Sequence, residues 1–402
     1  MFPGVASSGP GLTLLVRDCI ACTASLIPQP TGCRQPINMS SVLTSSTRID
    51  ARVRSRSARH LPFMHRARAI AIVWIVSMHC VGALDWSSNP HLYRFLVELF
   101  QGSTVLFFMI SGYLFQHLSD QFDYLGYLGN KFRHVILPYL VVSTPGIVLL
   151  LTKPEFAIDN PELSQASWWV KALFLYFYGG AQLNHVLWFV AVVAIYYLFA
   201  PVFIHVLRHP RWFASLLVLL PISLLAHRTT TQKYHHLQLA LYFLSAYMSG
   251  MAAGLYAERI LAFVNRYMGW FIGLFVALFA GHLMLTDYVG SYVDEIFSSS
   301  NGLIDWIFLQ KFVLFFVLIA LLRRVDRQRM DLVDHLATVS FAIYFLHIYV
   351  LHIYSHFVHW TQFPGSLASF ALLLAMSLGG SVAIAYLCRR VFGHNSRMLI
   401  GA

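Results

Sequence analysis

Long apolar runs alternate along the chain with short polar segments, and this pattern predicts an all-α polytopic membrane protein. A membrane-spanning helix needs about 17–25 mostly apolar residues, and ten runs reach or approach that length. They cover approximately 69–84, 95–115, 134–151, 186–204, 212–226, 238–256, 268–285, 303–322, 337–358 and 366–388. Segments such as FVLFFVLIALL are continuously apolar, where the strands of a β-barrel would alternate. We therefore expect a bundle of about ten transmembrane helices.

The basic residues predict how this bundle lies in the membrane. Ten spans would place both termini on one side, and cytoplasmic loops carry an excess of Lys and Arg. The loops and tail on the side of the N-terminus hold more Lys and Arg than the opposite loops, 13 against 5. Both termini are therefore predicted to be cytoplasmic. The net charge of +11 is assigned to this bias and not to nucleic-acid binding.

The N-terminal segment differs in kind from the apolar runs. Residues 1–63 are rich in Ser, Pro, Thr and Arg and show no periodicity, which predicts a disordered basic extension. Met64 precedes the first span, so a natural start at Met64 is one hypothesis. Residues 64–392 would form the membrane domain, and residues 393–402 a short cytoplasmic tail. Of the five cysteines, Cys19 and Cys22 have C-x-x-C spacing but lack the second pair of ligands that a zinc site needs, and no metal site is predicted.

Two basic residues in the first span are candidates for function, because an ionisable side chain in hydrocarbon is costly unless it faces a cavity or a partner. Arg68 and His79 are 11 positions apart, close to three helical turns. They would share one helix face and lie about 16 Å apart along its axis. This predicts a groove from Arg68 at the cytoplasmic mouth to His79 inside. The alternatives are a snorkelling arginine and a structural histidine.

The sequence leaves open the roles of other polar residues in or near the spans. Lys131, Arg133 and His134 precede the third span, where they can anchor the helix or bind the phosphates of a nucleotide-like cofactor. Lys311 is expected to face the interior or to snorkel. Glu98 is expected at the outer interface, with an acceptor-side acid as the alternative.

Five motifs, in the same order, make residues 65–390 resemble the membrane acyltransferase 3 family. They are Arg68 and His79 with ten residues between them, FFMISGYL at 107–114, Lys131 to Tyr139, Leu187 to Val190, and Tyr344 with His347. The chain departs from the family at His134, where relatives usually have Arg. It also lacks the frequent C-terminal esterase-like domain.

The resemblance implies a stand-alone O-acyltransferase of the cell membrane, with the bacterial inner membrane as its expected location. The donor would be cytoplasmic acyl-CoA, usually acetyl-CoA, as a co-substrate and not a permanently bound cofactor. The acceptor would be a hydroxyl of a carbohydrate or a lipid-linked glycan. His79 would act as general base or acyl carrier, which suits a neutral imidazole.

Further roles at this predicted site go to the polar residues of the other motifs. Ser111 and Tyr113 would donate hydrogen bonds to the thioester or oxyanion. The adjacent Ser111 and Gly112 could instead serve close helix packing. The phosphate-binding residues would be Arg68, Lys131, Arg133 and His134.

Two other classes of protein remain open from the residues alone. A haem- or metal-binding redox protein would use the histidines near the end of the chain, which are His347, His352, His356 and His359. A transporter would also suit a basic residue and a histidine in one groove. Against the transporter, the sequence shows no recognisable pair of broken helices in corresponding halves.

Overall fold

The fold is that of a computed structural model, which describes residues 61–152, 165–179, 186–229, 236–287, 289–290, 292–293, 304–358 and 363–402. Residues 1–60, most of the predicted extension, lie outside the described residues. The described part is nearly all helical, with one short parallel pairing between strands β1 (Arg228–Thr229) and β2 (Tyr292–Val293). The predicted all-α class is confirmed.

The helices follow one another as a series of short and long segments. In chain order they are α2 (Pro62–Gly82), α3 (Pro90–Phe100), α4 (Ser103–His117), η1 (Ser119–Gln121), α5 (Tyr124–Lys131), η2 (Phe132–Ile136), α6 (Leu137–Thr152), α8 (Trp168–Phe174), η4 (Leu175–Gly179), α9 (Trp188–Leu198), α10 (Ala200–Arg208), η5 (Pro210–Ser215), α11 (Leu216–Leu225), α12 (His236–Leu255), α13 (Ala257–Arg266), α14 (Met268–Leu285), α15 (Trp306–Arg324), α16 (Asp331–Thr338), α17 (Ser340–Val358), α18 (Leu367–Phe392), η7 (Gly393–Asn395) and α19 (Ser396–Ile400).

Among the described residues, 5 helical stretches are long and apolar enough to cross a membrane, or up to 8 if each bent helix pair is one span. The predicted runs 69–84, most of which lies in α2, and 212–226, most of which lies in the short apolar stretch Pro210–Leu225, are not among these. The protein is therefore a multi-pass membrane protein by this measure. The count of ten spans is not confirmed, and the orientation of the termini stays a prediction.

Three of the candidate spans are bent, which the sequence pattern does not reveal. The bends are 56° between α9 and α10, 96° between α12 and α13, and 77° between α16 and α17. Pro201 follows the first bend and begins α10, where its missing N–H costs nothing. The other two bends have no proline at the break, so tertiary packing sets them.

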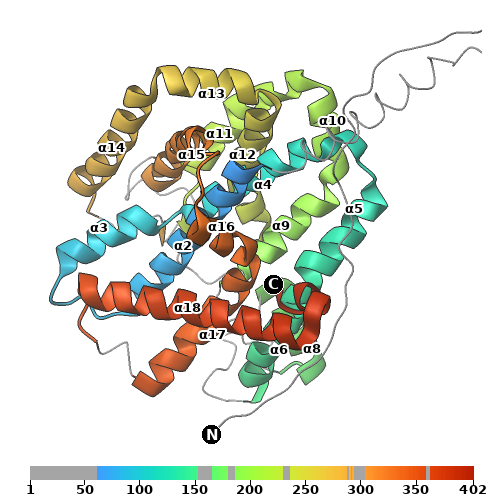
Figure 1. The fold of residues 1–402 in the computed structure, drawn as a ribbon, viewed down its shortest axis with the longest axis vertical. Helices are drawn as coiled ribbons and strands as arrows, with labels where there is room; N and C mark the ends of the chain where they lie inside the picture. Colours follow the sequence, from blue (N-terminus) through green and yellow to red (C-terminus); the bar gives the residue numbers. More distant parts are fainter. Residues whose placement is uncertain are drawn as a thin grey trace, which may run out of the picture. The chain divides into compact units, whose positions relative to one another are not determined.

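Helix α2 lies in the middle of the other helices (Figure 1). It packs against α3, α4, α15, α16, α17 and α18. The helix begins at Pro62, so Pro62 and Phe63 belong to the fold and not to the extension in which they were predicted. Phe63 is 1 % exposed and its ring meets Tyr113 edge-on, with the ring centroids 6.0 Å apart. The ordered bundle thus starts slightly earlier than the composition indicates.

Helices α4 and α12 pack with their backbones in close approach. A Cβ atom on Gly112 would lie 2.0 Å from the Tyr247 carbonyl oxygen, and one on Gly250 would lie 2.0 Å from the Met109 carbonyl oxygen. Only glycine fits at such distances, as is common where membrane helices cross. Close packing, which was one of the two interpretations of the motif at 107–114, is therefore confirmed for Gly112.

The end of the chain, predicted as a tail, is folded in the structure. Helix α19 packs against α6, α17 and α18. Gly401 has a positive φ of 76° and lies against Phe341 and Phe345 of α17. The Ser396 hydroxyl donates to the Ala402 carbonyl oxygen at 3.1 Å. These contacts bring Arg397 close to the start of α17.

We predict that Gly250→Ala lowers the unfolding temperature of the detergent-solubilised protein, because the new methyl group must push α4 and α12 apart. The expected loss is about 1–3 kcal/mol, the usual scale for overpacking. Gly269→Ala in α14 is the matched control, since a Cβ there meets nothing within 4 Å. Equal unfolding temperatures for the two variants would contradict the close approach.

Candidate active site

Two cavities meet at His79. One has a volume of about 40 Å³ and the other about 460 Å³. Ile75, Thr104 and Trp188 also line both of them. Within the described residues His79 forms no hydrogen bond, so its imidazole faces these spaces without a fixed protein partner.

The two cavities extend from His79 toward opposite ends of the helices. On α17, residues 340–344 contribute to the small cavity and residues 348–355 to the large one. On α2, the large cavity continues past His79 to Ala83, away from the Arg68 end. On α4, Phe107 lines only the small cavity. The lining residues on all three helices therefore indicate that the small cavity lies on the Arg68 side of His79.

The walls of the two cavities differ in chemistry. The small cavity is lined mainly by aromatic side chains, which are Phe107, Trp188, Phe189, Phe341 and Tyr344. The large cavity adds polar and charged groups, which are Gln101, Ser103, Arg228, His352 and Ser355. Among the described residues, no Asp or Glu lines either cavity.

His347 of α17 lies directly behind His79. The two ring centroids are 5.3 Å apart and the ring planes are inclined at 42°. His347 is fully buried, and its Nδ1 donates to the Ile343 carbonyl oxygen at 2.9 Å. Its Nε2 has no hydrogen-bond partner in the described part of the chain. The motif of Tyr344 and His347 was the sequence signal for this residue, although its role stayed open.

Tyr344 contributes to the same wall from one turn earlier. Its hydroxyl donates to the Val186 carbonyl oxygen at 2.8 Å, and its ring meets Phe189 edge-on. This bond fixes the start of α9 against α17. The segment from Leu187 that was singled out in the sequence thus forms part of the site through Trp188 and Phe189.

Arg68 is attached to the break between α16 and α17. Its Nη2 donates to the Ala337 carbonyl oxygen at 3.0 Å and lies 3.2 Å from His65 Nδ1. The Ser340 hydroxyl donates to the same carbonyl at 2.8 Å, and Ser340 lines the small cavity. Arg68 itself lines neither cavity at His79, so these cavities do not form the continuous groove predicted between the two residues.

Arg66, which the sequence analysis did not single out, makes a far denser set of contacts. Its guanidinium binds both carboxylate oxygens of Asp334, at 2.7 and 2.9 Å. It also donates to the carbonyl oxygens of Val325 at 3.0 Å and Gln328 at 2.8 Å. Such a bidentate pair orients α2 against α16. Of the two arginines, Arg66 is thus fully engaged in structure, while Arg68 retains unused donors.

Lys131 lies between two aromatic rings at the end of α5. Its Nζ is 5.3 Å from the ring centroid of Tyr127 and 5.0 Å from that of Tyr197, which are cation–π distances. Arg68 is within electrostatic range of Lys131, and Arg397 of α19 is within range of Arg68. The fold therefore gathers cations from three segments, and Arg397 is a member that the sequence analysis missed.

The other two basic residues predicted with Lys131 lie in the π-helical turn η2. Arg133 is exposed, and His134 Nδ1 pairs with the Asn130 carbonyl oxygen at 2.9 Å. Turns of this kind occur frequently at functional sites. The structure thus leaves the Arg133 guanidinium accessible beside the gathered cations.

Ser111 and Tyr113 lie apart from His79. Tyr113 packs on Phe63, which is 16 residues before His79, or about 24 Å along α2. Neither Ser111 nor Tyr113 lines the two cavities at His79. Thr104, at the start of the same helix, lies closer to His79 and was not identified from the sequence. The roles given to Ser111 and Tyr113 stay predictions.

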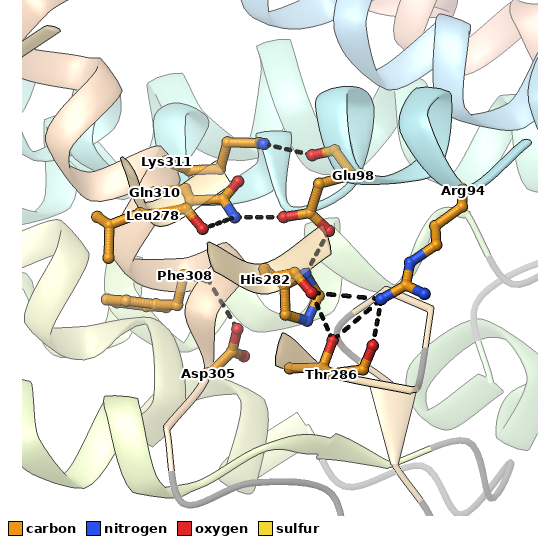
Figure 2. A network of polar contacts seen from close by, with 9 residues as sticks. All are labelled: Arg94, Glu98, Leu278, His282, Thr286, Asp305, Phe308, Gln310 and Lys311. Atoms are coloured by element: carbon orange, nitrogen blue, oxygen red, sulfur yellow. Dashed lines mark hydrogen bonds and ion pairs between the residues drawn. The ribbon is translucent and has the colours of Figure 1, made fainter. Parts of the chain in front are cut away.

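A buried polar network fixes the helices beside the large cavity (Figure 2). The Glu98 carboxylate accepts hydrogen bonds from His282 Nδ1 and Gln310 Nε2. Lys311 Nζ donates to the Glu98 backbone carbonyl at 3.0 Å and lies 5.7 Å from the Trp74 ring centroid. Glu98 is 2 % exposed and therefore lies inside the bundle, while its depth relative to the membrane interface stays a prediction. The prediction that Lys311 faces the interior is confirmed.

The network holds the turn that leads from α3 into α4. Gly102 has a positive φ of 76°, and a Cβ there would lie 2.4 Å from Ile307 Cγ2. The turn therefore needs glycine, both for its conformation and for its contact with α15. It delivers Ser103 and Thr104 to the cavity wall.

Arg228 enters the large cavity from the end of the described segment 186–229. Its guanidinium carbon lies 4.8 Å from the ring centroid of Trp188 and 5.8 Å from that of Phe243, and the residue is 7 % exposed. Arg228 is thus a buried cation in the cavity wall, because aromatic faces stabilise a guanidinium taken out of water.

The histidine stripe near the chain end lies partly outside the described residues. The side chain of His356 and the whole of His359 are not described. Within the described part of the chain, no group of three or more His, Cys, Asp or Glu is arranged to hold a metal ion.

Comparison with known proteins gives one match. The sequence model of the acyltransferase 3 family, described as an acyltransferase domain, matches residues 61–386. The comparisons with curated proteins and with solved structures each found no match. Because the matched residues cover most of the chain, the protein belongs to the acyltransferase 3 family and is a membrane acyltransferase.

We predict that Glu98→Ala destabilises the protein by at least about 2 kcal/mol, because it leaves buried donors on His282 and Gln310 without their acceptor. Thermal unfolding of the solubilised protein measures this loss. Glu258→Ala is the matched control, since the Glu258 side chain is 88 % exposed and lies 3.6 Å from Arg323. A surface pair of this kind contributes little. Similar unfolding temperatures for both variants would disprove the structural importance of the network.

Proposed function

We propose that the protein transfers an acyl group, specifically acetyl, from acyl-CoA to a hydroxyl of a carbohydrate or other cell-envelope acceptor, at His79. The observation that supports this most directly is the meeting of two chemically different cavities at His79. A transferase needs two substrates to reach one reacting group. Opposed cavities allow them to approach from different ends of the bundle.

The donor is assigned to the Arg68 side. The small cavity ends at Ser340, whose hydroxyl shares the Ala337 carbonyl oxygen with Arg68. Arg68, Lys131, Arg133, His134 and Arg397 supply the basic groups of this region. Cations of this kind bind phosphates through charge-assisted hydrogen bonds, and phosphates are what acyl-CoA carries at the end remote from its thioester.

The size of the small cavity favours a short acyl chain. Its volume of about 40 Å³ compares with the 10–15 Å³ that one water molecule requires in the same measure. It therefore has room for about three heavy atoms, which is the size of an acetyl group. Its aromatic walls suit a methyl group better than a polar substituent.

The acceptor is assigned to the large cavity. Its volume of about 460 Å³ is in the range of small-molecule sites. The ring of Trp188 offers an apolar face, and Gln101, Ser103 and Ser355 offer hydrogen-bonding groups. This combination suits a sugar, which presents hydroxyl groups at its edge and C–H bonds on its faces.

In the proposed reaction His79 takes the proton of the acceptor hydroxyl as the oxygen attacks the thioester carbonyl carbon. The new C–O bond forms, the C–S bond breaks, and the proton passes from His79 to the leaving thiolate, which gives free CoA. In the alternative course, His79 first accepts the acyl group on a ring nitrogen and then releases it to the acceptor.

We predict that His79→Ala and His79→Gln both lower acetyl transfer at least about a hundredfold, the usual contribution of a positioned base. Glutamine keeps much of the size and hydrogen bonding of histidine but has no basic nitrogen. The measurement is CoA release by membranes supplied with acetyl-CoA and an envelope glycan extract, together with mass spectrometry of the glycans.

The matched control is His205→Gln in α10, whose ring lies beside His209 and away from both cavities. Normal glycan acetylation by the His79→Gln protein would refute the catalytic assignment. A burst of CoA from wild-type protein without acceptor would favour the acyl-carrier course over direct transfer.

For Arg133 we predict a raised KM for acetyl-CoA, by about fivefold, with little change in kcat when Ala replaces it. The reason is that an exposed phosphate contact of about 1 kcal/mol, remote from the reacting carbon, contributes equally to ground state and transition state. Arg259→Ala in α13 removes an equally exposed cation elsewhere. If both variants have the wild-type KM, Arg133 does not bind the donor.

A further inference from the structure

We propose that His347 is a positioning residue for His79, with its buried Nε2 accepting a hydrogen bond from an N–H of the His79 ring. This inference rests on the proposed function of His79 and extends it to a second histidine. It assigns the histidine of α17 to the site, whereas the polar residues predicted for catalysis on α4 lie elsewhere.

The tautomer of His347 leaves one of its ring nitrogens as a hydrogen-bond acceptor. Its Nδ1 lies 2.9 Å from the Ile343 carbonyl oxygen, and a carbonyl oxygen only accepts. The proton of neutral His347 is therefore on Nδ1, which leaves Nε2 as a hydrogen-bond acceptor. That nitrogen is buried and has no partner among the described residues. An unpaired buried acceptor is costly, so its persistence points to a partner that engages during function.

The distance between the rings of His79 and His347 also supports the proposed hydrogen bond. The ring centroids of His79 and His347 are 5.3 Å apart. Two imidazoles joined by one N–H···N bond of about 3 Å have nearly this centroid separation. The two rings are not hydrogen-bonded in the described structure, so the proposed bond requires the His79 ring to turn while its backbone stays in place. His79 has no other hydrogen bond in the described part of the chain that would resist this turn.

The charged groups around His79 and His347 also support the proposed hydrogen bond. A catalytic histidine is commonly oriented by a carboxylate on its second nitrogen. Here no Asp or Glu of the described residues lines either cavity at His79, and the cation Arg228 lines the large cavity together with His79. Tyr344, the other polar neighbour of His347, already donates its hydroxyl proton to Val186. The neutral Nε2 of His347 is therefore an acceptor in position to orient His79.

In this arrangement the two nitrogens of His79 have separate tasks. The N–H donates to His347, and the unprotonated nitrogen faces the cavities, where it takes the proton of the acceptor hydroxyl. When His79 becomes an imidazolium, both its N–H groups are hydrogen-bond donors, and His347 continues to bind one of them. The second proton leaves with the thiolate, so His347 stays neutral throughout the cycle, with its own proton on Nδ1.

The test compares His347→Leu with His347→Gln in the full-length protein, using CoA release with acetyl-CoA and an envelope glycan extract. Leucine fills the buried site but accepts no hydrogen bond, whereas the amide oxygen of glutamine accepts one. We expect His347→Leu to lower kcat about tenfold to a hundredfold with unchanged KM for acetyl-CoA. We expect His347→Gln to recover at least half of the loss on a logarithmic scale.

Thermal unfolding separates positioning from structure. Because His347→Leu removes an unpaired buried nitrogen, its unfolding temperature should equal or exceed that of the wild type. A low kcat together with a lowered unfolding temperature and no recovery in His347→Gln would assign His347 to packing and overturn the inference. A normal kcat in His347→Leu would overturn it as well.

His79→Gln, measured in parallel, keeps the two hypotheses apart. If His79→Gln is inactive and His347→Leu is fully active, the proposed function stands and only the role of His347 fails. If His79→Gln retains wild-type activity, the catalytic role of His79 itself fails. His205→Gln again serves as the control for replacing a histidine outside the site.

Discussion

The guanidinium of Arg66 fixes α2, and the arrangement around His79 depends on this contact. Arg66 joins α2 to Asp334 of α16 and to backbone carbonyls that follow α15. Helix α16 turns by 77° into α17, which carries His347. The position of α2 along α16 therefore sets which residue of α17 meets His79. A buried, bidentate arginine is well suited to this, because displacement leaves several charged donors unsatisfied at once.

Apolar packing and a few polar contacts together hold the rest of the bundle. Glycines at 112 and 250 let α4 and α12 approach closely, and this contact supplies a rigid wall without any polar group. At the other end of α4, the network around Glu98 and the glycine turn at 102 set where the helix begins. The close contact with α12 and the network at the start of α4 together place Thr104 and Phe107 at fixed positions beside His79. The surroundings of His79 are thus held by residues to which the proposed chemistry assigns no part.

The unequal cavities relate the fold to group transfer. The small aromatic cavity lies toward Arg68 and the gathered cations, and the large polar cavity extends the other way. His79 lies at the junction of these two cavities. In the proposed reaction its imidazole is therefore central in the bundle, while the groups that would recognise the remote parts of each substrate are spread over several helices.

The apolar runs determined the helical, membrane-spanning class, because about twenty consecutive apolar residues have few other stable solutions. The spacing of Arg68 and His79 and the order of five motifs determined the family, which the match over residues 61–386 confirms. The sequence also identified His347 as part of a motif, but it did not predict which residue lies next to His347 in the fold. Periodicity describes one helix at a time, so it contains no information about which helices face each other.

Tertiary structure alone decided the contacts between distant segments. It buried Glu98 and Arg228, because their partners lie on other helices that are separated from them in the chain. It distinguished Arg66 from Arg68, two residues of identical chemistry, by what each side chain reaches. It also bent α16 against α17 without a proline, and so brought His347 behind His79. These outcomes depend on the packing of many side chains at once, which no local pattern encodes.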